Sequence, residues 1–152
     1  MIDRRAFVLA TSLILLAACS TTPGIEGSTY RGPTSLAGIR AENGLSSLSA
    51  DPALEAAALE QARFMADAGM MAHTTRRGGT FSNRMRSKPT NGGAAENIAH
   101  GRFGTDELFR RWMESPPHRR NILNRTFSRY GLASATDPKG GGRRYWALVL
   151  AR

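Results

Sequence analysis

The spacing of apolar residues along the chain predicts several helices. The clearest follows Asp51, a good N-cap residue, and Pro52, which suits the first helical position, and its apolar residues recur every three or four positions until Gly69. A short helix is expected at Ser35–Asn43, and the clearest one runs from Asp51 to Gly69. A third helix is expected to begin at Thr105, its N-cap, and to end at Pro116-Pro117, and a further helical turn is expected at Pro117–Leu123.

Two β-prone runs, Arg129–Thr136 and Arg143–Leu150, end the chain. The residues between them, Asp137–Gly142, contain Asp-Pro and three consecutive glycines, which predicts a hairpin turn. A shorter apolar stretch, Ala94–Ala99, is consistent with a brief strand or a turn. We therefore expect an α+β domain in which helices precede a C-terminal sheet.

The segment Thr74–Gly93 has no apolar periodicity. It is rich in Gly, Ser, Asn and basic residues, so we expect a long basic loop anchored by Phe81. Loops of this length that lack secondary structure of their own are often functional.

The N-terminal residues have the pattern of an export signal. Arg4 and Arg5 precede the apolar stretch Ala6–Ala18, which is shorter than the roughly 20 residues that a membrane-spanning helix needs. Leu16–Cys19 resembles the lipobox of bacterial lipoprotein precursors, in which the cysteine receives a diacylglyceryl group and becomes the new N-terminus. An ordinary cleaved signal, in which Cys19 plays no part, is the alternative, and export by the twin-arginine route stays open.

These patterns divide the chain into three parts. A signal peptide is expected at residues 1–18, a lipidated N-terminus with a flexible tether at residues 19–33, and one globular domain at residues 34–152. Two or more acyl chains on Cys19 would hold the protein durably at a membrane. The predicted location is the bacterial cell envelope, facing the periplasm if the cell is Gram-negative, and we expect a monomer.

The charge balance favours anionic partners. Lys and Arg together number 21 against 12 Asp and Glu, and 19 of the 21 are arginines, whose guanidinium groups fit phosphate and carboxylate. Lipid headgroups and wall polymers are the anions available at an envelope. Nucleic acid is disfavoured because the basic residues are not interleaved with aromatic ones. An arginine-rich surface that serves solubility alone is the plainer interpretation.

Three polar residues are candidates for a functional site. His73 follows the long predicted helix, Glu96 lies inside an apolar stretch where a carboxylate needs partners, and His118 follows the constrained segment Ser115–Pro117. Two imidazoles and one carboxylate are the minimum for a polar cleft, a weak metal site or general acid–base chemistry. The single cysteine excludes an internal disulfide and a thiolate zinc cage, so any metal must use His and carboxylate ligands.

Other polar and aromatic residues have structural interpretations. His100 would share a strand face with Glu96 and is a weaker candidate for the same cleft. Asn97 is expected to bond local backbone groups, and Ser115 to end a helix rather than act as a nucleophile, since no Gly-x-Ser-x-Gly context surrounds it. Five aromatic residues are expected in the core: Phe109, Trp112, Phe127, Tyr130 and Trp146.

Four segments resemble a bacterial CAP domain, of the superfamily of cysteine-rich secretory proteins, antigen 5 and pathogenesis-related 1 proteins. The resemblance covers Leu36 to Ala151 and implies an α-β-α sandwich with a small antiparallel sheet between helical layers. The segments are Ile39–Leu54, Met71–His73, Ala95–Ala99 and Trp112–Leu123.

The resemblance also implies a central cleft lined by two histidines and acidic residues. By matching motif these are His73, His118 and Glu96, and in related domains the two histidines can bind zinc or another divalent ion. The family's second glutamate is absent here, because Thr74–Ala95 contains no Asp or Glu. That stretch instead carries five cations, which should weaken metal binding and favour an anionic ligand: Arg76, Arg77, Arg84, Arg86 and Lys88.

Two functions follow from this cleft. The first is a noncatalytic envelope module that binds a lipid, a wall fragment or a protein partner. The alternative is a peptidase-like hydrolase in which Glu96 or a metal held by His73 and His118 activates water. The missing acidic residue favours the first.

Overall fold

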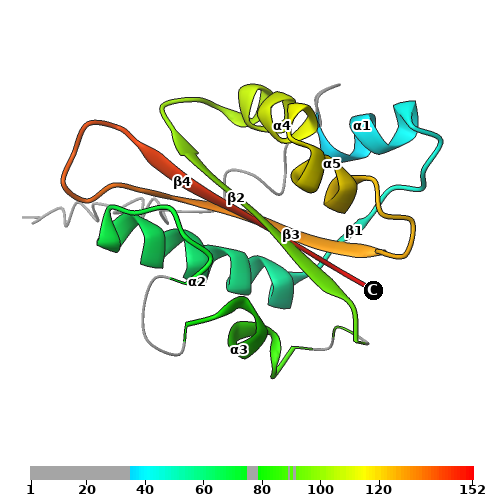
Figure 1. The fold of residues 1–152 in the computed structure, drawn as a ribbon, viewed down its shortest axis with the longest axis horizontal. Coiled ribbons are helices and arrows are strands. Elements are labelled where there is room, and N and C mark those ends of the chain that lie inside the picture. Colours follow the sequence, from blue (N-terminus) through cyan, green and yellow to red (C-terminus); the bar gives the residue numbers. More distant parts are fainter. Residues whose placement is uncertain (1–34, 75–78, 89, 91) are drawn as a thin grey trace, which may run out of the picture.

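The computed structural model describes residues 35–74, 79–88, 90 and 92–152. A four-stranded sheet lies between two layers of helices, as predicted (Figure 1). Within these ranges, no helix has both the length and the apolar character needed to cross a membrane. The helices are α1 (Leu36–Glu42), α2 (Pro52–Ala68), α3 (Phe81–Met85), α4 (Thr105–Glu114) and α5 (Pro116–Ile122), and the strands are β1 (Ser49–Ala50), β2 (Ala94–Gly101), β3 (Arg129–Thr136) and β4 (Arg144–Ala151).

The sheet has the strand order β1-β3-β4-β2, which leaves β2 at an edge. β4 pairs antiparallel with both β3 and β2, so the predicted C-terminal hairpin is present. The sheet is antiparallel, as expected, except at β1, which runs parallel to β3 over Ser49 and Ala50. A strand of two residues has no apolar alternation, so nothing in the sequence pattern could reveal it.

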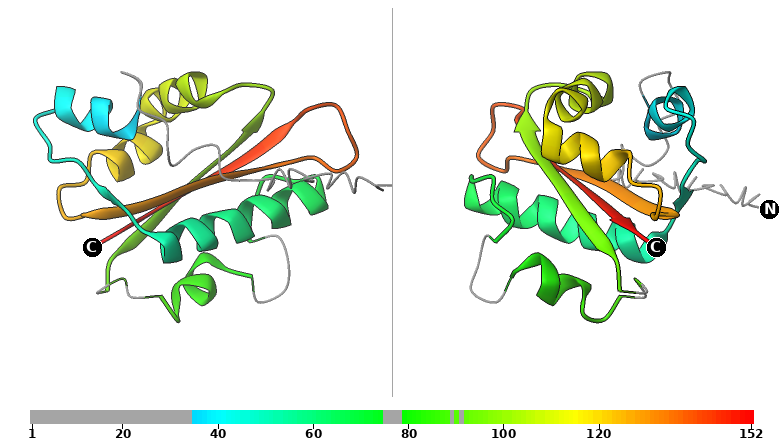
Figure 2. Two further views of the ribbon diagram at one scale, coloured as in Figure 1. Left: turned by 180° about the vertical axis from the view of Figure 1, so that it is seen from behind. Right: turned by 45° about the vertical axis from the view of Figure 1, so that its right-hand side comes forward.

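Each face of the sheet is covered by its own helices. Helices α1, α4 and α5 cover one face and α2 and α3 the other (Figure 2). Side chains of β4 alternate between the two cores: Trp146 and Leu148 join the cluster under α4, and Ala147 and Val149 join the cluster under α2. The predicted core aromatics are all buried: Phe109, Trp112, Phe127, Tyr130 and Trp146.

The first turn of α2 rests directly on β3. Asp51 caps the helix by accepting from the backbone N–H of Ala53 at 2.8 Å, as predicted, and its own N–H donates to Tyr130 O at 2.9 Å. Gly131 of β3 makes the close approach possible, since a Cβ atom there would overlap backbone atoms of Leu54 and Glu55. Helix α2 is thus fixed to the sheet through backbone groups.

Helices α4 and α5 meet at Ser115, which ends the first and precedes the second. This is the helix-ending role expected for that serine. The prediction that Thr105 is the N-cap of α4 is wrong by one residue: the cap is Gly104, whose backbone is extended, and no side chain caps the helix. Asp106 and Glu107 still occupy the first turn, where acidic side chains are favourable.

Part of the predicted basic loop is helical. Thr80 caps α3 by accepting from Asn83 N at 3.3 Å, and the helix buries Arg84 and Met85. Phe81 packs partly buried against the core under α2, as its expected role as an anchor requires. A helix of five residues is too short for a periodic pattern, so the sequence could not show it. Arg76 and Arg77 lie outside the described residues, as do the predicted signal, Cys19 and the tether.

Candidate functional site

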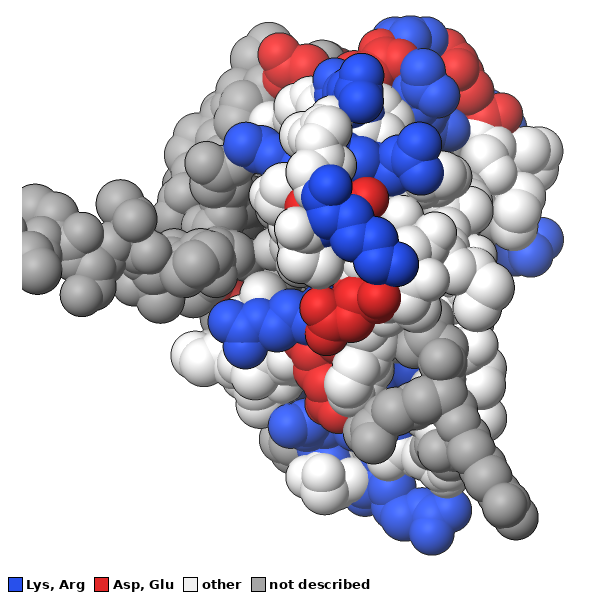
Figure 3. Space-filling view, turned by 90° about the vertical axis from the view of Figure 1, so that its left-hand side faces the viewer, with Lys and Arg blue, Asp and Glu red and all other residues white. Residues whose placement is uncertain are grey.

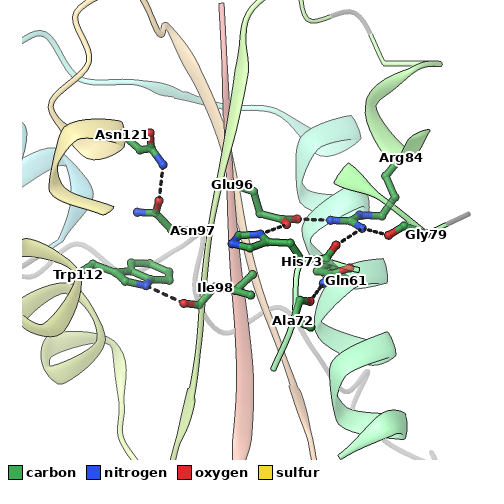
Figure 4. Close-up of polar contacts among 10 residues, drawn as sticks. All are labelled: Gln61, Ala72, His73, Gly79, Arg84, Glu96, Asn97, Ile98, Trp112 and Asn121. Atoms are coloured by element: carbon green, nitrogen blue, oxygen red, sulfur yellow. Dashed lines mark hydrogen bonds and ion pairs between the residues drawn. The ribbon is translucent and has the colours of Figure 1, made fainter. Parts of the chain in front are cut away.

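Glu96 forms a buried ion pair at the edge strand β2. Its Oε2 accepts a hydrogen bond from Arg84 Nη2 at 2.5 Å, and its Oε1 accepts one from His73 Nδ1 at 2.8 Å (Figure 4). The side chains of Arg84 and Glu96 are 3% and 2% exposed. Since a carboxylate only accepts, His73 carries its proton on Nδ1 in this contact. Both carboxylate oxygens are therefore occupied.

Arg84 reaches Glu96 from α3, in the layer that also contains α2. Its Nη1 donates to the backbone carbonyls of Gly79 at 2.6 Å and His73 at 3.2 Å. One guanidinium thus joins the segment before α3, the segment after α2 and the edge strand. This arrangement fixes the position of His73 relative to β2.

His73 lies at the surface end of this network. It follows α2, and the preceding carbonyl of Ala72 accepts a hydrogen bond from the buried Gln61 side chain at 2.6 Å. The His73 side chain is 55% exposed although its Nδ1 is bound to Glu96. Its Nε2 is therefore the ring nitrogen available to a ligand.

His118 approaches the same edge of the sheet from the opposite layer. It lies on α5 and is half-buried, and its backbone carbonyl accepts from Asn97 Nδ2 at 3.1 Å. Burial, and after it the charge of His73, lower the pKa of His118 from 6.5. His73 and His118 thus contact adjacent residues of β2, Glu96 and Asn97, from opposite layers.

Neighbouring side chains of β2 contact opposite helical layers. Glu96 points toward His73 and Arg84, whereas Asn97 points toward α5 and accepts from Asn121 Nδ2 at 2.8 Å (Figure 4). Asn97 is a structural pin, as predicted, but the expectation of local partners is wrong: both partners are more than twenty residues away. The pin positions α5, and with it His118.

His100 does not join this network. Strand β2 extends past the predicted Ala99 and contains His100, whose ring stacks on Tyr145 with centroids 5.6 Å apart. At about 3.3 Å per residue it lies roughly 13 Å along the strand from Glu96. His73 contacts Glu96 and His118 contacts the next residue, Asn97, whereas His100 lies apart from both contacts.

The role of Arg84 was missed by sequence reasoning, which treated it as one of five loop cations. It is neutralised by Glu96, and Arg86 donates to Asn83 Oδ1 at 3.1 Å. Arg84 is therefore not available to the anion that this local charge was expected to attract. The sequence did contain a usable signal. A buried carboxylate such as Glu96 needs a cationic partner, and the preceding loop offers only arginines and one lysine.

The donor set does not suit a firmly held metal ion. Among the described residues, no three His, Cys, Asp or Glu side chains gather in a way that could hold one. Glu96 is committed to Arg84 and His73, which leaves two imidazoles where a zinc site takes at least three protein ligands. The predicted metal site at His73 and His118 thus lacks a third ligand.

The surface charge is mixed. On the face shown in Figure 3, Lys and Arg side chains are interspersed with Asp and Glu. On α4, Glu107 pairs with Arg111 and also with Arg110, which contacts Glu114 at 2.6 Å. The positive charges of Arg110 and Arg111 are therefore balanced by acidic neighbours.

The shifted pKa of His118 predicts a pH dependence of stability. Unfolding returns the imidazole to its ordinary pKa of 6.5. Just below that pH, the unfolded chain therefore binds a proton more readily than the folded chain does. Stability from this group is complete above pH 6.5 and falls as the pH drops below it. Between about pH 7.5 and about pH 5, urea unfolding should show a smaller loss for His118→Gln than for the parent chain. An equal loss in both proteins would contradict the assignment.

Comparisons with known proteins agree with this fold. The model of the cysteine-rich secretory protein family (CAP) matches residues 34–150. An outer surface protein from Borrelia burgdorferi has the same fold, with a TM-score of 0.68 at 20% identity over 77% of this chain and 86% of that one. An extracellular protein containing a SCP domain from Bacillus anthracis has a TM-score of 0.65 at 26% identity, over 77% of this chain and 37% of that one.

A sequence relative is also bacterial. The uncharacterized protein YkwD of Bacillus subtilis is 33% identical over 94 residues, or 61% of this chain. The match spans only 37% of that relative's length. Since the family model spans nearly all of the described residues, the chain belongs to the cysteine-rich secretory protein (CAP) family.

Proposed function

We propose that this chain is a noncatalytic ligand-binding module of the bacterial cell envelope, with its ligand seated between His73 and His118. The observation that carries the proposal is the commitment of Glu96 to two partners. Both carboxylate oxygens accept hydrogen bonds within a buried ion pair. A general base must reach its substrate, and the Glu96 side chain is 2% exposed with its charge already paired with Arg84.

The imidazoles indicate the chemistry of the ligand. The lowered pKa of His118 keeps it neutral at pH 7, and a neutral imidazole both donates and accepts hydrogen bonds. Sugar hydroxyls and peptide amides do the same, and both are abundant in bacterial cell walls. A wall fragment is therefore the ligand class that suits the cleft best, ahead of a lipid or a protein partner.

Export and anchoring complete the proposal. The predicted signal and lipobox would deliver the domain across the membrane and attach it through Cys19. Two structural neighbours are described as an outer surface protein and an extracellular protein. A lipid-anchored monomer on the outer side of the inner membrane, or on the outer membrane, would meet wall fragments there.

The contact between Glu96 and His73 also favours a second candidate, a hydrolase. A carboxylate that accepts from Nδ1 orients an imidazole so that its Nε2 can take a proton from water, at a cleft that also contains His118. Ser115 lies at the joint between α4 and α5, and among the described residues it has no hydrogen bond to His73 or His118. The hydrolase therefore ranks second.

Titration of the full chain with soluble disaccharide-peptide wall fragments tests the proposal. We expect binding without turnover, weakened by about tenfold or more in His73→Ala and in His118→Ala. His100→Ala is the matched control, because it removes a histidine of the same domain that lies outside the cleft. Fragment cleavage that is lost in His73→Ala would establish the hydrolase instead, and an absence of both binding and cleavage would reject the wall-fragment ligand.

A further inference from the structure

A polar pocket lies at the β1–β3 side of the sheet, opposite the edge strand β2. It is lined by the segment between α1 and β1 and by the segment between α5 and β3, and its volume is about 320 Å³. No acidic residue is among those that line it: Arg40, Gly44, Leu45, Ser46, Ser47, Arg125, Phe127 and Ser128. The pocket thus combines two arginines and three serines with the apolar side chains of Leu45 and Phe127.

Arg40 is the unusual member of this pocket. The residue is 2% exposed, and its guanidinium meets only backbone carbonyls: Nε donates to Ser46 O at 2.8 Å, and Nη1 donates to Ile122 O at 2.7 Å and Asn124 O at 3.0 Å. In the part of the chain that the structure describes, no carboxylate pairs with it and Nη2 donates to no residue. A buried cation therefore retains two N–H donors beside a cavity.

The structural role of Arg40 does not need these donors. By binding Ile122 and Asn124, Nη1 satisfies carbonyls at the end of α5, and Nε holds the segment after α1. Burial lowers the pKa of Arg40, which means that the protein disfavours its charge, yet a guanidinium stays protonated. A buried charge without a counter-ion is costly, and an anion in the pocket would supply one.

The lining residues fit an oxyanion. A guanidinium binds a carboxylate or a phosphate through parallel N–H···O bonds, and serine hydroxyls can donate to the remaining oxygens. Arg125 is exposed and adds a second positive charge to the lining. Leu45 and Phe127 can contact an apolar portion of the molecule that carries the anion.

We propose that this pocket is a binding site for a single oxyanion group, a carboxylate or a phosphate, with Arg40 Nη2 as its first donor and Arg125 as its second cation. The site is separate from the cleft between His73 and His118, which lies at the other edge of the sheet. The proposal therefore does not depend on the function assigned to that cleft.

The test is a calorimetric titration of the full chain with inorganic phosphate and with acetate. Saturable binding of either anion is expected, and it should weaken by about tenfold or more in Arg125→Glu and in Ser47→Asp, both of which change exposed residues. Arg63→Gln, an exposed arginine on α2, is the matched control and should bind as the parent chain does. His73→Ala should also leave this affinity unchanged, which separates the pocket from the cleft.

Further arms identify the donor and the source of the anion. Arg40→Lys keeps the charge but loses the planar fork, so it should weaken binding if it folds by circular dichroism; if it does not fold, Arg125→Glu and Ser47→Asp decide. Glycerol 3-phosphate represents a lipid headgroup, and a dipeptide with a free C-terminus represents a wall peptide, so their relative affinities show which anion the pocket prefers. Absence of saturable binding by all four probes would overturn the proposal, as would binding that Arg125→Glu and Ser47→Asp leave unchanged.

Discussion

Replacing Arg84 with methionine should lower the free energy of unfolding by about 3–5 kcal/mol. The substitution removes the cationic partner of Glu96, whose side chain is 2% exposed, and leaves an uncompensated charge in the protein interior. It also removes the hydrogen bonds to the carbonyls of Gly79 and His73. Urea unfolding followed by circular dichroism measures the loss.

Two further variants make this expectation specific. Arg86→Met changes an exposed arginine at the end of α3 and should cost less than about 1 kcal/mol. Adding Glu96→Gln to Arg84→Met removes the unpaired negative charge and should restore part of the lost stability. A loss below about 1 kcal/mol in Arg84→Met itself would show that Glu96 does not depend on this ion pair.

Replacing Gly131 with alanine should destabilise the domain by about 3 kcal/mol or more, at the upper end of overpacking costs. A Cβ atom at this position would overlap backbone atoms of Leu54 and Glu55. Backbone cannot change rotamer, so the first turn of α2 would have to move away from β3. That movement would also strain the hydrogen bond from Asp51 N to Tyr130 O.

Gly104→Ala is the matched control for this substitution. A Cβ atom at Gly104 would meet no atom within 4 Å, and its backbone is extended. The expected cost is less than about 1 kcal/mol and comes from alanine being a poorer N-cap than glycine. Thermal unfolding of the two variants gives the comparison, and similar midpoints would show that α2 can shift freely over β3.

Much of the fold could be predicted because its longer elements have strong local patterns. Helix α2 combines a capping aspartate, a proline and an apolar repeat, and the hairpin of β3 and β4 contains three glycines with positive φ, from 66° to 92°. Elements below about six residues carry no such pattern, which is why β1 and α3 were missed. The parallel pairing of β1 depends on where the chain passes after α1, which local sequence does not determine.

The site was predictable in part, for a related reason. Family motifs picked out His73 and Glu96, which the structure brings into contact, but no motif connected Arg84 to them. The loop from Thr74 to Gly93 offered five cations of equal standing. Only the three-dimensional position of α3 shows that Arg84 is buried against Glu96, and Arg40 is another arginine whose burial the sequence did not indicate.

The edge position of β2 has a mechanical consequence. His73 follows α2 on one face of the sheet, and His118 belongs to α5 on the other, so the two imidazoles are carried by layers with separate cores (Figure 1). A molecule bound by both imidazoles would connect the two helical layers across the edge of the sheet and would resist sliding of either layer. The rigidity of the whole sandwich would then be part of its binding free energy, and residues far from the cleft could tune affinity by stiffening either layer.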